Sequence, residues 1–205
     1  MRSFRLNPVP EAQENLVSAA QLLLPKLLHL KDSQSTPVVL IDGRAGSGKS
    51  TFAELLKNFV FQEEKQSPRV IHMDDIYQGW DGLEEGSLYL SEQILKPLRS
   101  KGNAEWQRWD WERGVRGGKD EGNGWKSFEG QNLLIVEGCG SVTETTNQLA
   151  DLCIWVESSH ETRKLRFHER DRGKFSEHWI PWSIQEDAFY QKHNSKGLCH
   201  LVVEN

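Results

Sequence analysis

The sequence has no excess of positive charge. Its 205 residues include 25 lysines and arginines against 30 aspartates and glutamates, which gives a formal net charge of -5 at pH 7. This balance excludes the overall basic surface with which proteins bind nucleic acid or anionic lipid. We therefore expect no nucleic-acid partner and no membrane partner, and any anion site must be local.

Cysteines and long apolar runs are also scarce. The three cysteines, Cys139, Cys153 and Cys199, lie far apart and are odd in number, which argues against a disulfide framework and a zinc site. No apolar run approaches the ~20 residues of a membrane helix, and the first residues lack the apolar core of a secretory signal. The sequence therefore predicts a cytoplasmic location. The seven histidines are scattered, and we assign them no metal-binding or catalytic role.

Short apolar segments alternate with helix-like segments. Strands buried on both faces are predicted at residues 38–42, 69–74, 132–138 and 151–157. Helices are predicted at residues 49–62, 87–100, 159–172 and 177–192. This alternation predicts an α/β fold with three layers and a mostly parallel central sheet.

The remaining segments surround that core. An amphipathic helix, which we expect Pro25 to kink, is predicted at residues 11–30 and belongs to an N-terminal helical extension, residues 1–36. The glycine-rich stretch 112–130 is expected to be a mobile loop, and the tryptophan-rich tail from residue 176 onward to cover the sheet. The length favours a single domain over residues 1–205.

The first predicted strand leads into the stretch GRAGSGKS, residues 43–50. It fits the pattern G-x-x-x-x-G-K-[ST] between a strand and a helix, which is typical of a P-loop. Glycines there let backbone N–H groups surround phosphate oxygens, the lysine reaches the outer phosphates, and the hydroxyl binds Mg²⁺. We expect ATP, or alternatively GTP, to bind the following residues: Gly43, Arg44, Ala45, Gly46, Ser47, Gly48, Lys49, Ser50 and Thr51.

Acidic and aromatic residues follow the second predicted strand. Asp74 and Asp75 come at its carboxyl end, where a carboxylate can accept a proton from a substrate hydroxyl or can cap a turn. Further along, Trp109 and Trp111 flank Asp110. They could form a pocket wall or one buried face of a strand.

The stretch Asp74-Asp75-Ile76-Tyr77 resembles the D-x-F-Y motif of the uridine kinase family of P-loop kinases. That resemblance implies that Asp74 is the catalytic base and that Tyr77 lines the acceptor pocket.

Two further motifs extend the resemblance, which implies a role for each. Trp109, Asp110 and Trp111 stand where the family has the Y-D-F stretch that contacts the nucleoside. Glu137, at the end of an apolar strand, is similar to the family's glutamate beside the magnesium ion, so Ser50 and Glu137 are the candidate metal ligands.

Arginines follow the fourth predicted strand. Arg163, Arg166 and Arg170 would share one face of a helix, as either a phosphate clamp or a solvated surface. Their spacing resembles the family's lid, here about residues 159–176. The resemblance implies that Arg166 and Arg170 cover the transferring phosphoryl group, and we place Arg163 with the nucleotide-binding residues.

The leading hypothesis is therefore a small-molecule kinase. It would transfer the γ-phosphoryl group of ATP, with Mg²⁺, to a hydroxyl of a small, nucleoside-like acceptor. The alternative is a regulatory ATPase that signals to a partner. A nucleic-acid end kinase ranks last, because the stretch WDGLEEG beside Asp74 is acidic. The acceptor's identity and the oligomeric state stay open.

Overall fold

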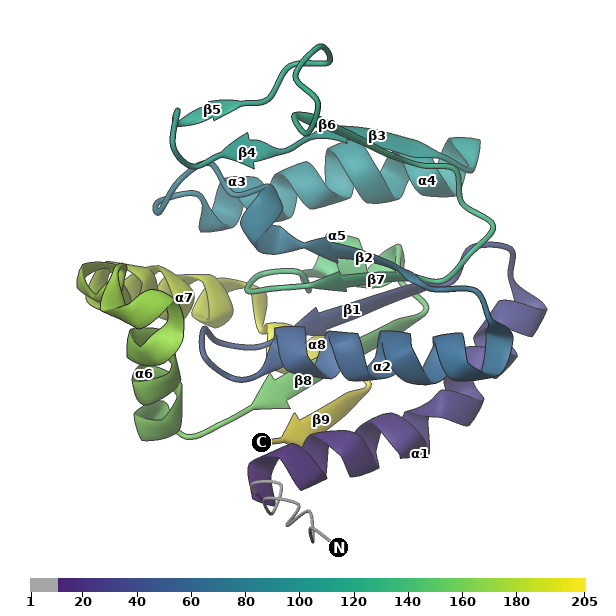
Figure 1. The fold of residues 1–205 in the computed structure, drawn as a ribbon, viewed down its shortest axis with the longest axis horizontal. Coiled ribbons are helices and arrows are strands. Elements are labelled where there is room, and N and C mark those ends of the chain that lie inside the picture. The colour runs from purple at the N-terminus through teal and green to yellow at the C-terminus, as the bar shows by residue number, and fades with distance from the viewer. Residues whose placement is uncertain (1–10) are drawn as a thin grey trace, which may run out of the picture.

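The computed structural model describes residues 11–205, apart from the side chains of residues 11–13 and 171. The first ten residues of the predicted N-terminal extension lie outside this range. A five-stranded parallel sheet forms the centre, in the strand order β2-β7-β1-β8-β9 (Figure 1). In chain order the strands are β1 (Val38–Asp42), β2 (Arg69–His72), β7 (Leu134–Glu137), β8 (Leu152–Glu157) and β9 (Leu201–Glu204).

Helices cover both faces of this sheet, so the predicted three-layer α/β fold is confirmed. On one face, α1 (Glu11–Ser33) and α2 (Lys49–Glu64) pack against Val39 and Ile41 of β1. On the other face, α3 (Leu83–Tyr89) and its continuation pack against Val38 and Leu40. Successive residues of β1 therefore point into different cores, which explains why the strand is apolar throughout. Helix α1 contains Pro25 in its interior.

The second face carries most of the remaining helices. A π-helical segment, η2 (Leu90–Leu95), and α4 (Lys96–Lys101) continue α3. The helices that follow β7 and β8 are α5 (Glu144–Gln148), α6 (His160–Glu169), α7 (Trp179–His193) and α8 (Ser195–Leu198). Single 3-10 turns are η1 (Met73–Asp75), η3 (Arg170–Gly173) and η4 (Ser176–His178). Figure 1 shows the carboxyl ends of the strands pointing toward α6 and α7.

The expectation of a loop at residues 112–130 is wrong in part. Two antiparallel pairs lie beyond α4: β3 (Ala104–Gln107) with β6 (Trp125–Phe128), and β4 (Trp109–Asp110) with β5 (Val115–Arg116). Strand β6 forms because its partner β3 buries Ala104 and Trp106 against α4 and η2. The glycine-rich and charged composition of residues 112–130 does not indicate β5 and β6, because contacts with their partner strands stabilise these two strands.

The C-terminal tail also adds a strand. Strand β9 pairs in parallel with β8, with Ile154 opposite Leu201 and Glu157 opposite Glu204. No helix within residues 11–205 is both long enough and apolar enough to span a bilayer.

Candidate active site

The P-loop connects β1 to α2 at the carboxyl edge of the sheet. Its three glycines have positive φ values: +145° at Gly43, +78° at Gly46 and +103° at Gly48. A Cβ atom at Gly46 would lie 2.3 Å from the carbonyl oxygen of Arg163 on α6. Glycine is therefore required here both for the backbone conformation and for the close approach of α6.

Lys49 begins α2 and points into the loop. Its amine donates to the Arg44 carbonyl at 3.0 Å and lies 3.5 Å from the Cys139 sulfur. Burial acts to lower the pKa of Lys49, but Cys139, Glu137 and Glu186 oppose this electrostatically, so the pKa is raised. The amine therefore stays positively charged at the mouth of the loop.

Ser50 and Glu137 meet across two neighbouring elements. The Ser50 hydroxyl donates to Glu137 Oε1 at 2.9 Å, and His72 Nδ1 lies 2.6 Å from the same oxygen. The hydrogen bond to Glu137 raises the pKa of His72. Glu137 is reached by His72 because the two residues are directly paired between β2 and β7.

This group has the chemistry of a magnesium site. A hydroxyl oxygen and a carboxylate oxygen are the ligands that Mg²⁺ prefers, and this ion normally takes only one or two of them from protein beside a phosphate. No cluster of three or more histidine, cysteine or acidic residues suited to a metal exists within residues 11–205. The hydroxyl of Ser50 and the carboxylate of Glu137 are donors that fit Mg²⁺ bound together with phosphate oxygens.

Asp74 lies in η1, immediately after β2. Its side chain lines the cavity and is 63% exposed to solvent, and one carboxylate oxygen lies 3.7 Å from Arg170 Nη1. The protein around the carboxyl group desolvates it and raises the pKa of Asp74, while Arg170 acts in the opposite direction. Asp75 instead turns away and pairs with Arg108.

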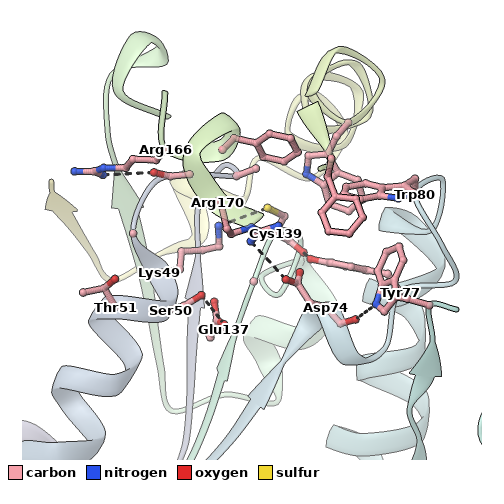
Figure 2. A pocket seen from close by; sticks show the side chains of 18 residues that line it. Lys49, Ser50, Thr51, Asp74, Tyr77, Trp80, Glu137, Cys139, Arg166 and Arg170 are labelled. Atoms are coloured by element: carbon pink, nitrogen blue, oxygen red, sulfur yellow. Dashed lines mark hydrogen bonds and ion pairs between the residues drawn. The ribbon is translucent and has the colours of Figure 1, made fainter. Parts of the chain in front are cut away.

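A cavity of about 750 Å³ joins these groups, and Figure 2 shows Asp74 between the P-loop side and Trp80. The cavity has a phosphate-binding side, an acidic centre and an aromatic side. Its lining residues are Ala45, Gly46, Gly48, Lys49, Ser50, Thr51, Asp74, Tyr77, Trp80, Trp111, Glu137, Gly138, Cys139, Arg166, Phe167, Arg170, Phe175 and Trp182.

The predicted lid arginines do not share one environment. Helix α6 ends at Glu169, so Arg170 stands on η3, and Arg166 and Arg170 both line the cavity. Arg163 is buried instead, with its guanidinium 3.4 Å from the Ala45 carbonyl and 3.9 Å from Glu186. The prediction that the three arginines share one helix face is therefore wrong. Helix α6 ends before Arg170, and its first turn, which carries Arg163, packs against the P-loop.

Several other predicted residues lie outside the cavity lining. Gly43 and Ser47 form the base of the loop, and Arg44 reaches Asp187 at 2.6 Å. Trp109 is half-buried, with its ring 5.9 Å from the Arg116 guanidinium. Asp110 accepts hydrogen bonds from the backbone of the turn that follows it. Of the predicted Trp-Asp-Trp stretch, only Trp111 lines the cavity.

The sequence interpretation missed most of the aromatic side. Trp182 belongs to the tail that is expected to cover the sheet; it is buried, and it also lines the cavity with Trp80, Phe167 and Phe175. Glu186 was missed as well, although the spacing of Trp182 and Glu186 is one helical turn and could have suggested a pair. Its Oε1 atom accepts from the Ala45 amide at 2.6 Å and from the Trp182 ring nitrogen at 3.1 Å.

Comparisons with known proteins add the fold relationship. Neither a protein-family model nor a curated protein sequence matches this chain. Among solved structures, one from Bacillus stearothermophilus, described as a possible uridine kinase, matches with a TM-score of 0.63 and 17% identity over 92% of this chain and 98% of its own. One from Silicibacter sp. TM1040, provisionally named a fructose transport system kinase, matches with a TM-score of 0.56 and 17% identity over 91% and 98%. At this identity the likeness shows the fold alone, and the chain shares its three-layer α/β fold with these two structures.

Proposed function

We propose that this protein is a small-molecule kinase that transfers the γ-phosphoryl group of ATP, or alternatively GTP, to a hydroxyl group. The observation that carries the proposal is that a P-loop lysine and an open carboxylate line one cavity: Lys49 on one side and Asp74 facing it. Of the two adjacent aspartates, Asp75 pairs with Arg108, whereas Asp74 lines the cavity beside Arg170.

The proposed reaction uses Asp74 as the general base. The acceptor oxygen attacks the γ-phosphorus while its proton passes to the Asp74 carboxylate. The bond between the γ-phosphorus and the bridging oxygen breaks, so the products are a phosphate monoester and ADP. A raised pKa of Asp74 suits this step, because a stronger base takes the proton more readily.

Positive groups offset the charge of the transferring phosphoryl group. Lys49, Arg166 and Arg170 line the cavity, and arginine can engage two oxygens at once. We propose that residues 159–176 act as a lid that brings the two arginines over the phosphate and excludes water. Mg²⁺, held by Ser50 and Glu137, would supply further neutralisation of phosphate charge.

The acceptor side supports a small molecule that carries a flat ring, which is one part of the nucleoside-like acceptor that the family resemblance implies. Trp80, Trp111 and Trp182 contribute ring surfaces to the cavity beside Asp74. Tyr77, which the family resemblance places at the acceptor, lines the cavity with them.

The test is magnesium-dependent ADP release across nucleosides, sugars and ring-bearing alcohols, with the Asp74→Asn protein measured beside the native chain. One acceptor should raise turnover by roughly a hundredfold, and Asp74→Asn should remove that increase while leaving ATP affinity within about threefold. Near-normal turnover by Asp74→Asn would refute the base assignment. Slow hydrolysis that no acceptor stimulates would favour a regulatory ATPase instead.

A further inference from the structure

We infer that the acceptor is a neutral or cationic alcohol built on a flat aromatic ring, without a polyol such as ribose or a hexose and without an anionic group. The inference rests on the proposed function and narrows it to a substrate class. Three independent features of the acceptor side carry it: its ring surfaces, the state of its polar groups and the location of its positive charges.

The first feature is the concentration of rings around Trp80. Its ring stacks on His178 with centroids 4.1 Å apart and planes inclined by 6°. The centroid of the Trp80 ring also lies 5.3 Å from that of Trp111, 5.4 Å from that of Phe175 and 6.0 Å from that of Trp182. Rings from the loop after η1, the turn after β4, and the η4–α7 region therefore meet at one place, where a flat ring can stack and displace water.

The second feature is that the polar atoms of three side chains in the cavity lining, Tyr77, Trp111 and Trp182, are already hydrogen-bonded within the protein. The Tyr77 hydroxyl donates to the Cys139 carbonyl at 2.7 Å. The Trp111 ring nitrogen donates to the Asp74 carbonyl at 2.9 Å, and the Trp182 ring nitrogen donates to Glu186 at 3.1 Å. These three groups present their ring surfaces, and not their hydrogen-bond donors, to a ligand.

A polyol requires the opposite arrangement. Each hydroxyl that leaves water needs a protein partner, and an unpaired one is costly. Asp110, which the family resemblance places against the nucleoside, lies outside the cavity lining, and its Oδ1 atom accepts from the amides of Glu112 and Arg113, both at 3.0 Å. A ribose or a hexose would therefore lose hydrogen bonds on entering this site.

The third feature is the placement of positive charge. The only lysine or arginine residues lining the cavity within the described chain are Lys49, Arg166 and Arg170. Lys49 belongs to the P-loop, Arg166 lies 3.4 Å from the Gly46 carbonyl, and Arg170 faces Asp74. Lys49 and Arg166 are committed to the phosphate side, and Arg170, which also lies 5.7 Å from the Phe167 ring, is paired with Asp74. An anion at the aromatic side would meet ring faces and the Asp74 carboxylate, whereas a cation is attracted by both.

The experiment compares three alcohols of nearly the same shape and different charge. Nicotinyl alcohol is neutral, its N-methyl derivative is a cation, and hydroxymethylbenzoate is an anion. Each is measured with uridine and fructose in two assays: quenching of tryptophan fluorescence, and ADP release with Mg²⁺ and ATP. We expect the neutral and cationic ring alcohols to exceed the anion, uridine and fructose by at least about tenfold in affinity and in kcat/KM.

Paired variants of Trp111 test the ring itself. Its side chain is 41% exposed, so replacement should leave the fold intact. Trp111→Leu removes the ring and should raise KM for the two favoured alcohols roughly tenfold, whereas Trp111→Phe keeps a ring face and should stay within about threefold. Equal losses in the two variants would show that the hydrogen bond to Asp74 matters and would overturn the stacking role.

The outcomes separate this inference from the proposed function. Turnover of uridine, fructose or the anion at least equal to that of the neutral and cationic ring alcohols, dependent on Asp74, would overturn the inference and leave the kinase standing. Selective binding of the neutral and cationic ring alcohols without any ADP release would support the ring site and refute the kinase.

Discussion

At the scale of single residues, the aspartates at the carboxyl ends of β1 and β2, Asp42 and Asp74, differ in burial and in role. Asp42 ends β1 and is fully buried, with its oxygens accepting from the amides of Gly43, Gly140 and Val142 and from the Tyr190 hydroxyl. Burial raises the pKa of Asp42 to about 6. Asp42 connects the P-loop to the loop after β7 through these hydrogen bonds and has no access to a substrate. Asp74, in contrast, lines the cavity.

The exposed aspartate yields a prediction about pH. A base must be deprotonated, so kcat/KM should fall as pH drops through the raised pKa of Asp74, above the ordinary aspartate value of 3.8. Arg170 lowers this pKa, so Arg170→Gln should move the acid limb to higher pH, besides reducing kcat. Arg166→Gln is the matched control and should reduce kcat without moving the limb. An acid limb that stays in place in Arg170→Gln would contradict this electrostatic coupling.

Two adjacent carboxylates on α7 allow a prediction about stability. Both contact Arg44, but the Glu186 side chain is 0% exposed and also lies 3.9 Å from buried Arg163, whereas the Asp187 side chain is 70% exposed. Glu186→Ala leaves buried positive charge uncompensated and should lower the free energy of unfolding by about 3–5 kcal/mol. Asp187→Ala removes only a solvated ion pair and should cost less than about 1 kcal/mol.

Urea unfolding measures the change in the free energy of unfolding for both variants. The P-loop amide of Ala45 also loses its acceptor in Glu186→Ala, so ATP affinity should decline in that variant alone. Similar unfolding free energies for the two variants would show that Glu186 does not stabilise the loop.

At the scale of elements, the P-loop is in direct backbone contact with α6. The approach of the Arg163 backbone to Gly46 leaves no space for a side chain. This contact explains why Arg163 is buried while Arg166, three residues later on α6, reaches the cavity. The position of the proposed lid is therefore set from the phosphate side.

A pair of glycine substitutions tests this contact. Gly46 and Gly102 have nearly the same φ, +78° and +79°, but a Cβ at Gly102 meets no described atom within 4 Å. Gly102→Ala should therefore cost only the backbone strain, about 1 kcal/mol. Gly46→Ala should cost at least about 2 kcal/mol more, because α6 must move away, and it should also weaken ATP binding. Equal costs in thermal or urea unfolding would mean that α6 does not bear on the loop.

At the scale of the whole molecule, the sheet brings distant segments to one edge. Lys49, Asp74 and Glu137 are far apart in the chain, and each follows or ends a strand of the same parallel sheet. Their common cavity lies at the carboxyl ends of these strands, as expected for parallel α/β sheets. A nucleotide bound there would contact α2, the loop after β7 and α6 together, so binding should stabilise the molecule as a unit.

Thermal unfolding with and without magnesium and ATP measures this effect. At a ligand concentration one hundred times Kd, binding stabilises a protein by about 2.7 kcal/mol. For a chain of this size the midpoint should rise by roughly 5 to 10 °C. Lys49→Ala should abolish most of this rise, whereas Lys57→Ala, on the exterior of α2, should keep it. A rise of equal size in Lys49→Ala would place the nucleotide elsewhere.

The sequence alone determined the parts that depend on local pattern. The four predicted apolar segments correspond to β1, β2, β7 and β8, with bounds close to the predicted ones. They could be recognised because a strand that is buried on both faces consists of consecutive apolar residues. The P-loop was recognisable because its glycines, lysine and serine are contiguous. The alternation of strands with helices was sufficient to predict the parallel three-layer fold, which the structure confirms.

Only the tertiary structure decided how the acceptor side is built. Trp80 and Trp182 lie about a hundred residues apart, and no periodicity links the loop after η1 to α7. The pairing of His72 with Glu137 depends on the register between β2 and β7. Asp110 lies outside the cavity lining because its side chain binds the backbone of the turn that follows it. Such contacts arise when the helices pack onto the sheet, so they follow from the sum of long-range burial and not from any local stretch.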